Sequence, residues 1–265
     1  MHRLITGIIL IILMSIGVLI SAAQGMTAKD IQQKSIDVTR IDGTEALSTL
    51  IIMNEKGEKR IRKMAVVTKQ FEKGTLEKKL IKFTEPADVN GTGFLTYDYD
   101  SKSDDKWIYL PALRKTRRII SAENAKSFMG SEFSYADMSR PDVEEFTYKF
   151  LPDEAVNGEN CYVLEIIPLN SELEDENGFS KKISYISKKD HLLRKSVYFD
   201  LYGDKEKIMT VKSIVEVDKQ KHKYRLKEIE MENVQNGRTS ISRIETIQFN
   251  PNISDEYFTT RYLEK

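Results

Sequence analysis

Alternation of apolar and polar residues dominates this chain from Thr44 onward and restricts its fold more than any other feature. In the run 209–217, Met209, Val211 and Val217 share one set of alternate positions, and polar residues such as Lys212 occupy positions between them. A period of two places successive side chains on opposite faces of a β-strand. The pattern therefore predicts a sheet protein in which one face of most strands is apolar.

Turn signals separate these alternating runs. Asn-Gly pairs favour the tight turns of β-hairpins, in which both central residues need a positive φ. Counting the runs between such signals predicts roughly ten or eleven antiparallel strands. The signals lie at 54–57, 73–74, 157–158, 202–204 and 236–237.

Helix signals occur near the two ends of residues 24–265. Thr27 and Asp30 have the spacing of an N-cap and an acidic residue in the first turn, and Gly43 ends the helical pattern. Ser254 can cap a short C-terminal helix. We therefore predict a mainly β fold: a strongly curved antiparallel sheet or incomplete β-barrel of about 11 strands, with a long N-terminal helix and short covering helices. No linker divides residues 24–265, which are expected to form a single domain.

The first 23 residues have the features of a secretory signal peptide. Arg3 precedes an apolar run from Leu4 to Ile20, and small residues end at Ala23. We predict cleavage after Ala23. An uncleaved membrane anchor is the alternative, because the 17 residues from Leu4 to Ile20, none of them charged, are just long enough to span a bilayer.

Charge and cysteine content exclude some functions. The chain carries 41 Lys+Arg and 41 Asp+Glu, whereas proteins that bind nucleic acids usually have a clear basic excess. Cys161 is the only cysteine, so no intramolecular disulfide can form. Its position in an apolar run predicts a small buried side chain.

The segment 106–138 has the most unusual sequence of the chain. Residues 107–110 are predicted to form a strand that Pro111 interrupts, because proline cannot donate to a β-ladder. A second strand is expected over 113–120. Residues 127–131 are predicted to form a loop, and 134–138 a short helix that Ser134 can cap.

This segment resembles the signature of a known family. The pattern Trp-x-Tyr-Leu-Pro-Ala-Leu-x-Lys-x-Arg-Arg-Ile at 107–119 is followed by Ser-Phe-Met-Gly-Ser-x-Phe-Ser-Tyr-x-Asp at 127–137. Both are similar to the bacterial outer-membrane lipoprotein-sorting proteins of the LolA-like superfamily, in the branch often associated with exporters of the RND type. No motif here matches the residues with which LolA itself holds its cargo. The resemblance implies a periplasmic protein whose incomplete β-barrel, closed by helices, encloses an apolar cavity for the acyl chains of a lipid or lipoprotein.

Two groups of residues in this segment are candidate site residues. Apolar and aromatic residues are expected either in the lid or rim of a lipid cavity or in the ordinary core. Basic residues are expected either to bind anionic headgroups or a partner protein, or to protect an edge strand from aggregation. The first group is Trp107, Tyr109, Leu110, Phe128, Met129, Phe133 and Tyr135, and the second is Arg114, Lys115, Arg117 and Arg118.

Catalytic signatures are missing from the sequence. His191 and His222 lie among lysines and not in a metal-ligand spacing, and no nucleophile elbow or phosphate-binding loop is present. The acidic residues at 98–100 and 104–105 are predicted to lie in solvated turns, and the acidic run 172–176 in an exposed hairpin loop. We therefore expect a protein that is not an enzyme and has no cofactor or metal.

The expected function is that of a periplasmic carrier, or chaperone, which moves acyl chains of a lipid or lipoprotein toward the outer membrane. An RND-type exporter or a lipoprotein-releasing complex at the inner membrane would be its protein partner, and we expect a monomer that binds no nucleic acid. The alternative is an adaptor that docks on the periplasmic part of an exporter without holding lipid. Filling of the concave face by the protein's own side chains would favour the adaptor.

Overall fold

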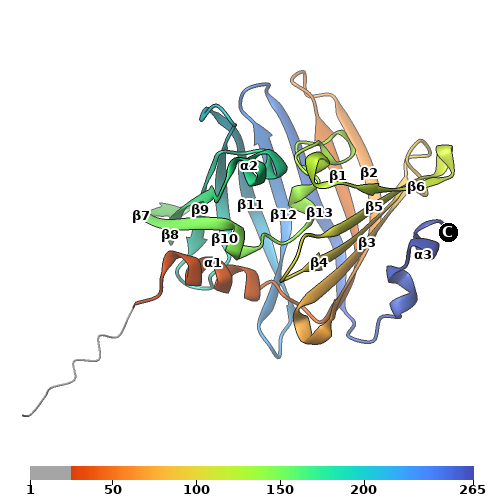
Figure 1. Ribbon diagram of the computed structural model, residues 1–265, viewed down its shortest axis with the longest axis horizontal. Coiled ribbons are helices and arrows are strands. Elements are labelled where there is room, and N and C mark those ends of the chain that lie inside the picture. The colour runs from red at the N-terminus through yellow and green to blue at the C-terminus, as the bar shows by residue number, and fades with distance from the viewer. Residues whose placement is uncertain (1–24) are drawn as a thin grey trace, which may run out of the picture.

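Thirteen antiparallel strands form one open, strongly curved sheet in the computed structural model, which describes residues 25–265 (Figure 1). The mainly β fold expected from the alternation is confirmed. Neighbouring strands follow the order β6-β5-β4-β3-β2-β1-β13-β12-β11-β10-β9-β8-β7. The strands are β1 (Gly43–Met53), β2 (Lys59–Phe71), β3 (Leu76–Glu85), β4 (Gly93–Tyr99), β5 (Asp105–Leu110), β6 (Lys115–Ile119), β7 (Phe146–Val156), β8 (Glu159–Pro168), β9 (Lys181–Ser187), β10 (Leu193–Phe199), β11 (Lys205–Asp218), β12 (Lys223–Asn233) and β13 (Arg238–Phe249).

The sheet has two more strands than the predicted count of about eleven. The turns before β10 and β12 contain no glycine, and each has a histidine in the left-handed region: His191 has a φ of 58° and His222 a φ of 50°. Histidine adopts this conformation more often than most residues other than glycine. A count that relies on Gly and Asn-Gly signals does not detect such turns.

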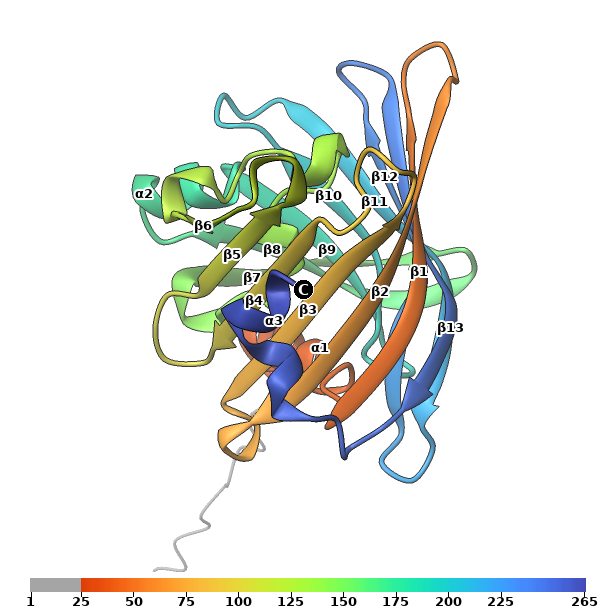
Figure 2. The same cartoon turned by 90° about the vertical axis from the view of Figure 1, so that its right-hand side faces the viewer.

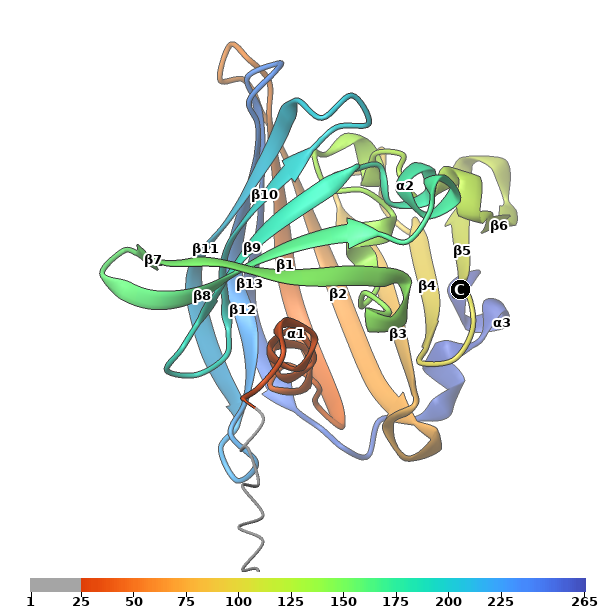
Figure 3. The ribbon, with the colours of Figure 1, turned by 60° about the vertical axis from the view of Figure 1, so that its left-hand side comes forward.

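Helix α1 (Ala28–Asp37) begins as predicted and lies inside the curve of the sheet, where it contacts β7 and β9 (Figure 3). The Thr27 hydroxyl accepts a hydrogen bond from the Asp30 backbone N–H at 3.2 Å, and the Asp30 carboxylate accepts one from the Thr27 N–H at 2.8 Å. This reciprocal capping satisfies two of the free N–H groups at the helix start. Ile31 is fully buried and anchors α1 to the core.

The acidic run 172–176 forms a helix, so the prediction of a hairpin loop there was wrong. Helix α2 (Ser171–Asn177) is capped by the Asn170 side chain, which accepts from the Leu173 N–H at 2.9 Å. Gly178 ends the helix in the left-handed conformation. Asn before and Gly after an acidic run are helix-capping residues, and this signal was present in the sequence.

The C-terminal segment covers the outer, convex face of β3 and β4 (Figure 2). A 3-10 helix (Asp255–Phe258) is capped by Ser254, as predicted, and is followed by α3 (Thr260–Leu263). A Cβ on Gly93 would lie 2.5 Å from the Leu263 side chain, so glycine allows α3 to pack this closely. Phe258 and Leu263 are buried there beside Leu95.

The connection between β6 and β7 runs from one edge of the sheet to the other, because these consecutive strands are the two edge strands. Residues 120–145 therefore cross the open side of the sheet. The connection contains short 3-10 helices at Ser121–Glu123, Phe128–Gly130, Ala136–Met138 and Val143–Glu145. The second half of the family-like motif, 127–137, thus lies over the concave face.

The proposed signal peptide, residues 1–23, lies outside the described residues. Within residues 25–265, no helix has the length and apolar character needed to cross a membrane.

Candidate functional site

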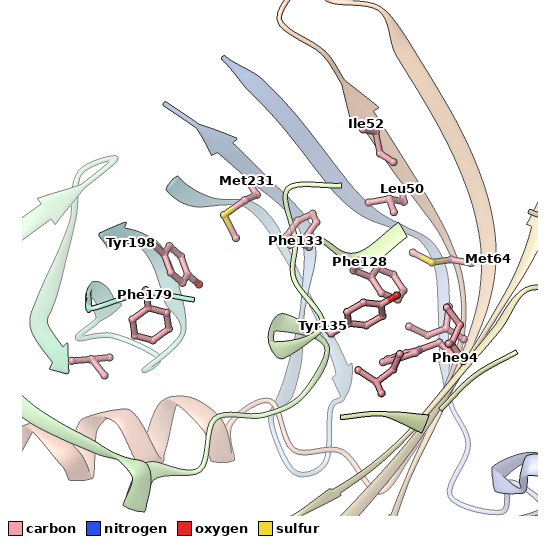
Figure 4. Packing of buried hydrophobic residues seen from close by; sticks show 14 of the residues in the cluster. Leu50, Ile52, Met64, Phe94, Phe128, Phe133, Tyr135, Phe179, Tyr198 and Met231 are labelled. Atoms are coloured by element: carbon pink, nitrogen blue, oxygen red, sulfur yellow. The ribbon is translucent and has the colours of Figure 1, made fainter. Parts of the chain in front are cut away.

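The concave inner face of the sheet has a filled half over β1–β5. Phe128 is 2 % exposed and contacts Phe83, Phe94 and Tyr135, with ring centroids 6.0, 5.3 and 5.7 Å away. Figure 4 shows Phe128 and Tyr135 beside Phe94, at a distance from Tyr198 and Phe179. We call residues 127–135 the plug, since their aromatic side chains occupy this half.

Hydrogen bonds from two strands hold the tip of the plug. Arg62 on β2 donates to the Met129 carbonyl, and Arg238 on β13 donates to the Gly130 carbonyl at 2.9 Å. Met129 has a φ of 52°, which places a residue other than glycine in the left-handed region. The two arginines therefore fix a tight turn whose backbone is strained.

A buried acid holds the plug to the far strands. The Glu132 carboxylate accepts from Asn233 at 3.1 Å and forms an ion pair with Arg238 at 3.0 Å. Its backbone N–H donates to the Ser240 hydroxyl at 3.0 Å. The plug is thus bound to β12 and β13 as well as to the aromatic core.

The hollow half of the inner face, over β9–β12, contains a cavity of about 340 Å³. Its walls are the inner side of these strands, one side of α1, residues 136–146 of the crossing connection and the loop between β4 and β5. Apolar side chains from α1, β7 and β10–β12 line much of it. They are Ile36, Phe146, Leu193, Met209, Leu226 and Ile229.

Two polar side chains lie opposite each other in the wall formed by β9 and β10. Lys182 pairs in register with Tyr198, and the Lys182 ammonium lies 5.5 Å from the centre of the Tyr198 ring and 5.2 Å from that of Phe179. Neither the ammonium nor the Tyr198 hydroxyl has a hydrogen bond or ion pair within residues 25–265. Burial lowers the pKa of Lys182 and raises that of Tyr198 well above its usual value, with Asp137 as the nearby charge.

Carboxylates gather on the side of the cavity near the β4–β5 loop. Burial, with Asp142, Glu176 and Asp104 nearby, raises the pKa of Glu145 to about 7. Lys106 is 4 % exposed; its ammonium lies 3.5 Å from Asp104 and donates to the Asn124 side chain at 3.1 Å. This end of the cavity therefore has more acidic than basic groups.

Asp98 contradicts the prediction that the acidic residues at 98–100 lie in a solvated turn. It is 2 % exposed within β4 and accepts a hydrogen bond from the Arg140 backbone N–H at 2.8 Å. Burial and Asp104 raise its pKa to about 7, although the Arg140 guanidinium opposes this shift. Arg140 also lies 3.2 Å from Asp100, so it holds the crossing connection to the end of β4.

The seven apolar site candidates separate into two places, and none of them lines the cavity. Phe128, Phe133 and Tyr135 are buried in the core of the inner face, and Leu110 and Met129 pack partly buried against it. The two remaining candidates, Trp107 and Tyr109, lie in the apolar cluster of the outer face under the C-terminal segment.

The four basic candidates lie on or beside edge strand β6, and none of them lines the cavity. Arg114 precedes the strand, and Arg114 and Lys115 are exposed. Arg117 forms an ion pair with Glu123 at 2.8 Å, and Arg118 with Asp105.

Sequence reasoning missed Lys182, Tyr198 and Glu145. Lys182 and Tyr198 lie on strands, and Glu145 lies in the 3-10 helix Val143–Glu145 of the crossing connection. An alternating pattern cannot show which positions border empty space. Among residues 25–265, no group of three or more His, Cys, Asp or Glu side chains is arranged to hold a metal. Cys161 is fully buried, as predicted.

Solved structures similar to this chain have the same fold. An outer membrane lipoprotein-sorting protein domain from Vibrio parahaemolyticus is 28% identical with a TM-score of 0.82, covering 90% of this chain and 98% of its own. A DUF1329 family protein from Desulfovibrio piger is 27% identical with a TM-score of 0.81, covering 89% and 97%. A LolA superfamily protein from Nitrosomonas europaea, 18% identical with a TM-score of 0.69 and covering 89% and 99%, shares the fold.

At the level of sequence families, a model described as that of an uncharacterized protein matches residues 75–265, which is more than half of the chain. None of the curated proteins matches the chain. The matched region contains the whole 107–137 motif, the plug and every strand from β3 to β13. The chain therefore belongs to the family of this model, and its fold is the one seen in the similar lipoprotein-sorting and LolA superfamily structures.

Proposed function

We propose that this protein is a periplasmic carrier that binds an acyl chain of a lipid or lipoprotein in the cavity of the hollow half and carries it toward the outer membrane. The cavity itself is the observation that supports this proposal. It lies on the inner face of a LolA-like sheet, and apolar side chains such as Leu193 and Ile229 form much of its wall.

The free energy of transfer explains why a cavity suits this function. Burying an acyl chain gains about 0.8 kcal/mol per methylene, so ten methylenes gain roughly 8 kcal/mol on leaving water. A carrier must enclose most of the chain to obtain this gain. An open apolar patch on the surface would leave one side of the chain in water.

Two further observations agree with the proposal. The sequence of residues 1–23 predicts export. The similar domain from Vibrio parahaemolyticus is described as lipoprotein-sorting.

Lipid binding can be tested directly on the protein produced in its native compartment. Mass spectrometry of co-purified lipids and titration with a fluorescent fatty acid should both detect bound chains. Ile229→Trp should fill the cavity and abolish most of the uptake, whereas Ile120→Trp, at a position 59 % exposed on the outside, should not. Protein that is always empty and takes up no fatty acid would contradict the carrier proposal.

A second candidate function is an adaptor that docks on the periplasmic part of an RND-type exporter or a lipoprotein-releasing complex. The exposed edge near β6 favours it, because the basic Arg114 and Lys115 lie there between two exposed apolar residues, Leu113 at 67 % and Ile120 at 59 %. Arg114→Glu with Lys115→Glu should then weaken binding to the purified partner and leave fatty-acid uptake unchanged. Unchanged partner binding would contradict docking through this edge.

A further inference from the structure

We propose that the ligand of this cavity is a single-chain amphiphile with an anionic head, a carboxylate or a phosphate ester, and that Lys182 and Tyr198 bind the head. This inference rests on the proposed carrier function and specifies its ligand class.

Lys182 and Tyr198 present two hydrogen-bond donors to the same space. They are partners in the register between β9 and β10 and therefore lie on the same face of the sheet. Tyr198 is 8 % exposed, and both residues line the cavity. Lys182 is partly exposed, and neither its ammonium nor the Tyr198 hydroxyl is among the fully buried polar atoms of residues 25–265 that lack a hydrogen-bond partner. Both donors are therefore open to a ligand that enters the cavity. An anion between the ammonium and the hydroxyl would satisfy both.

Two other cations of the cavity wall form ion pairs with carboxylates. Arg140 is bound to Asp98 and Asp100, and Lys106 to Asp104. Lys102 lies outside the interior with its ammonium 3.8 Å from the centre of the Tyr99 ring. Lys182 is therefore the interior lysine of this wall that has no carboxylate within ion-pair distance among residues 25–265.

Acidic groups elsewhere in the wall restrict where an anionic head can lie. Asp137 is the acid that acts on Lys182; its carboxylate is held by the Ser134 N–H at 2.8 Å and the Ser134 hydroxyl at 2.9 Å, and it forms no ion pair with the ammonium. Glu145 and Glu176, on the side near the β4–β5 loop, would repel an anion. The favourable position for the head is thus beside Lys182, and the chain follows the apolar wall toward Leu193 and Ile229.

The cavity volume favours a ligand with one chain. Its volume of about 340 Å³ is at the low end of the range of about 300–1,000 Å³ for small-molecule sites. A ligand with one chain of about ten carbons is therefore a suitable probe of this cavity.

Calorimetric titration with three ten-carbon ligands tests the head and the chain separately. Decanoate and monodecyl phosphate carry the two kinds of anionic head, and decan-1-ol has the same chain without charge. Lys182→Met keeps most of the apolar stem and removes the ammonium, and Tyr198→Phe removes only the hydroxyl. Lys181→Met is the matched control, because Lys181 is adjacent in β9, points to the opposite face and lies 4.5 Å from the Phe199 ring centre.

We expect Lys182→Met to weaken decanoate or monodecyl phosphate binding about tenfold or more, and Tyr198→Phe to weaken it about threefold or more. Binding of decan-1-ol should change less than twofold in both variants, and Lys181→Met should behave like the wild type. Of decanoate and monodecyl phosphate, the ligand whose affinity falls more in Lys182→Met carries the anionic head that Lys182 prefers.

The contrary results separate this inference from the carrier proposal. Binding of decan-1-ol with no preference for either anion would overturn the anionic head and leave the carrier intact. An equal loss for decan-1-ol and the anions in Lys182→Met would show that Lys182 only shapes the wall, which also overturns the inference. Wild-type protein that binds none of the three ligands would contradict the carrier function itself.

Discussion

The two halves of the inner face belong to one sheet but have different contents. Over β1–β5, large inner residues such as Phe83 and Phe94 meet the aromatic side chains of the plug and leave the space filled. Over β9 and β10, the corresponding interior has Ser184 and Ser196, whose hydroxyls lie 3.0 Å apart. Small side chains at inner positions, with no plug above them, leave room for the cavity.

This difference separates the residues that hold the fold from those available to a ligand. The plug contains most of the second half of the family-like motif, yet its aromatic residues are core and its backbone is held by Arg62 and Arg238. The hollow half has a lysine and a tyrosine hydroxyl without partners in the described chain. The plug therefore fills one half of the inner face, and residues outside the motif form the wall of the cavity in the other half.

The largest expected effect is on stability, when the filled half loses its central ring. Phe128→Ala should reduce the free energy of unfolding by about 3–5 kcal/mol, because it removes buried ring contacts and leaves a cavity. Urea unfolding followed by circular dichroism measures this. Leu113→Ala, at an exposed position, is the control and should cost less than about 0.5 kcal/mol. A small loss of stability in Phe128→Ala together with altered fatty-acid uptake would identify Phe128 as part of a lid instead.

A matched pair of enlargements contrasts the two halves directly. Ile81→Trp in the filled half should cost about 1–3 kcal/mol, because its surroundings are already packed. Ile229→Trp in the hollow half should cost less than about 1 kcal/mol, since the added ring can occupy the cavity. Both are measured by urea unfolding. Equal costs would mean that the hollow half has no usable space.

Much of the fold follows from the sequence because alternation and capping act locally. Most of the strands, the Thr27 cap of α1 and the burial of Cys161 were predictable in this way. The turn at His222 was not, because no local signal marks it.

The site depends on long-range placement, which a sequence pattern does not contain. Asp98 and Arg140 are far apart in the chain and are brought together only when the connection crosses the sheet. Nothing in the sequence around Lys182 distinguishes it from the other lysines that lie in strands. Whether it borders solvent, core or a cavity depends on the size of the side chains on β10 to β12 and on the position of α1.

A smaller effect is expected from pH at the acidic side of the hollow half. Burial and nearby acids raise the pKa of Glu145 to about 7, so the folded protein holds this proton more tightly than the unfolded chain does. Its contribution to stability is therefore present at low pH and is lost as pH rises from about 4.5 through 7. In Glu145→Gln, the fall in the free energy of unfolding between low and neutral pH should be smaller by on the order of 1 kcal/mol. The expected difference is small because Glu145 is only half-buried and solvent screens its charge. Urea unfolding at pH 5 and pH 8 measures the change, and an identical decline in the variant would contradict it.

The smallest effect is expected at the basic edge, outside both halves. Arg118 forms an ion pair with Asp105, but its side chain is 60 % exposed, and exposed pairs contribute about 0–1 kcal/mol. Arg118→Ala should therefore change the free energy of unfolding by less than about 1 kcal/mol and leave decanoate affinity as in the wild type. Urea unfolding and calorimetry on the same sample measure both quantities. A tenfold loss of decanoate affinity would show that the ligand head reaches β6. The basic edge would then be part of the binding site. If decanoate affinity is unchanged in Arg118→Ala but falls in Lys182→Met, then Lys182 contributes to binding of the ligand and Arg118 does not.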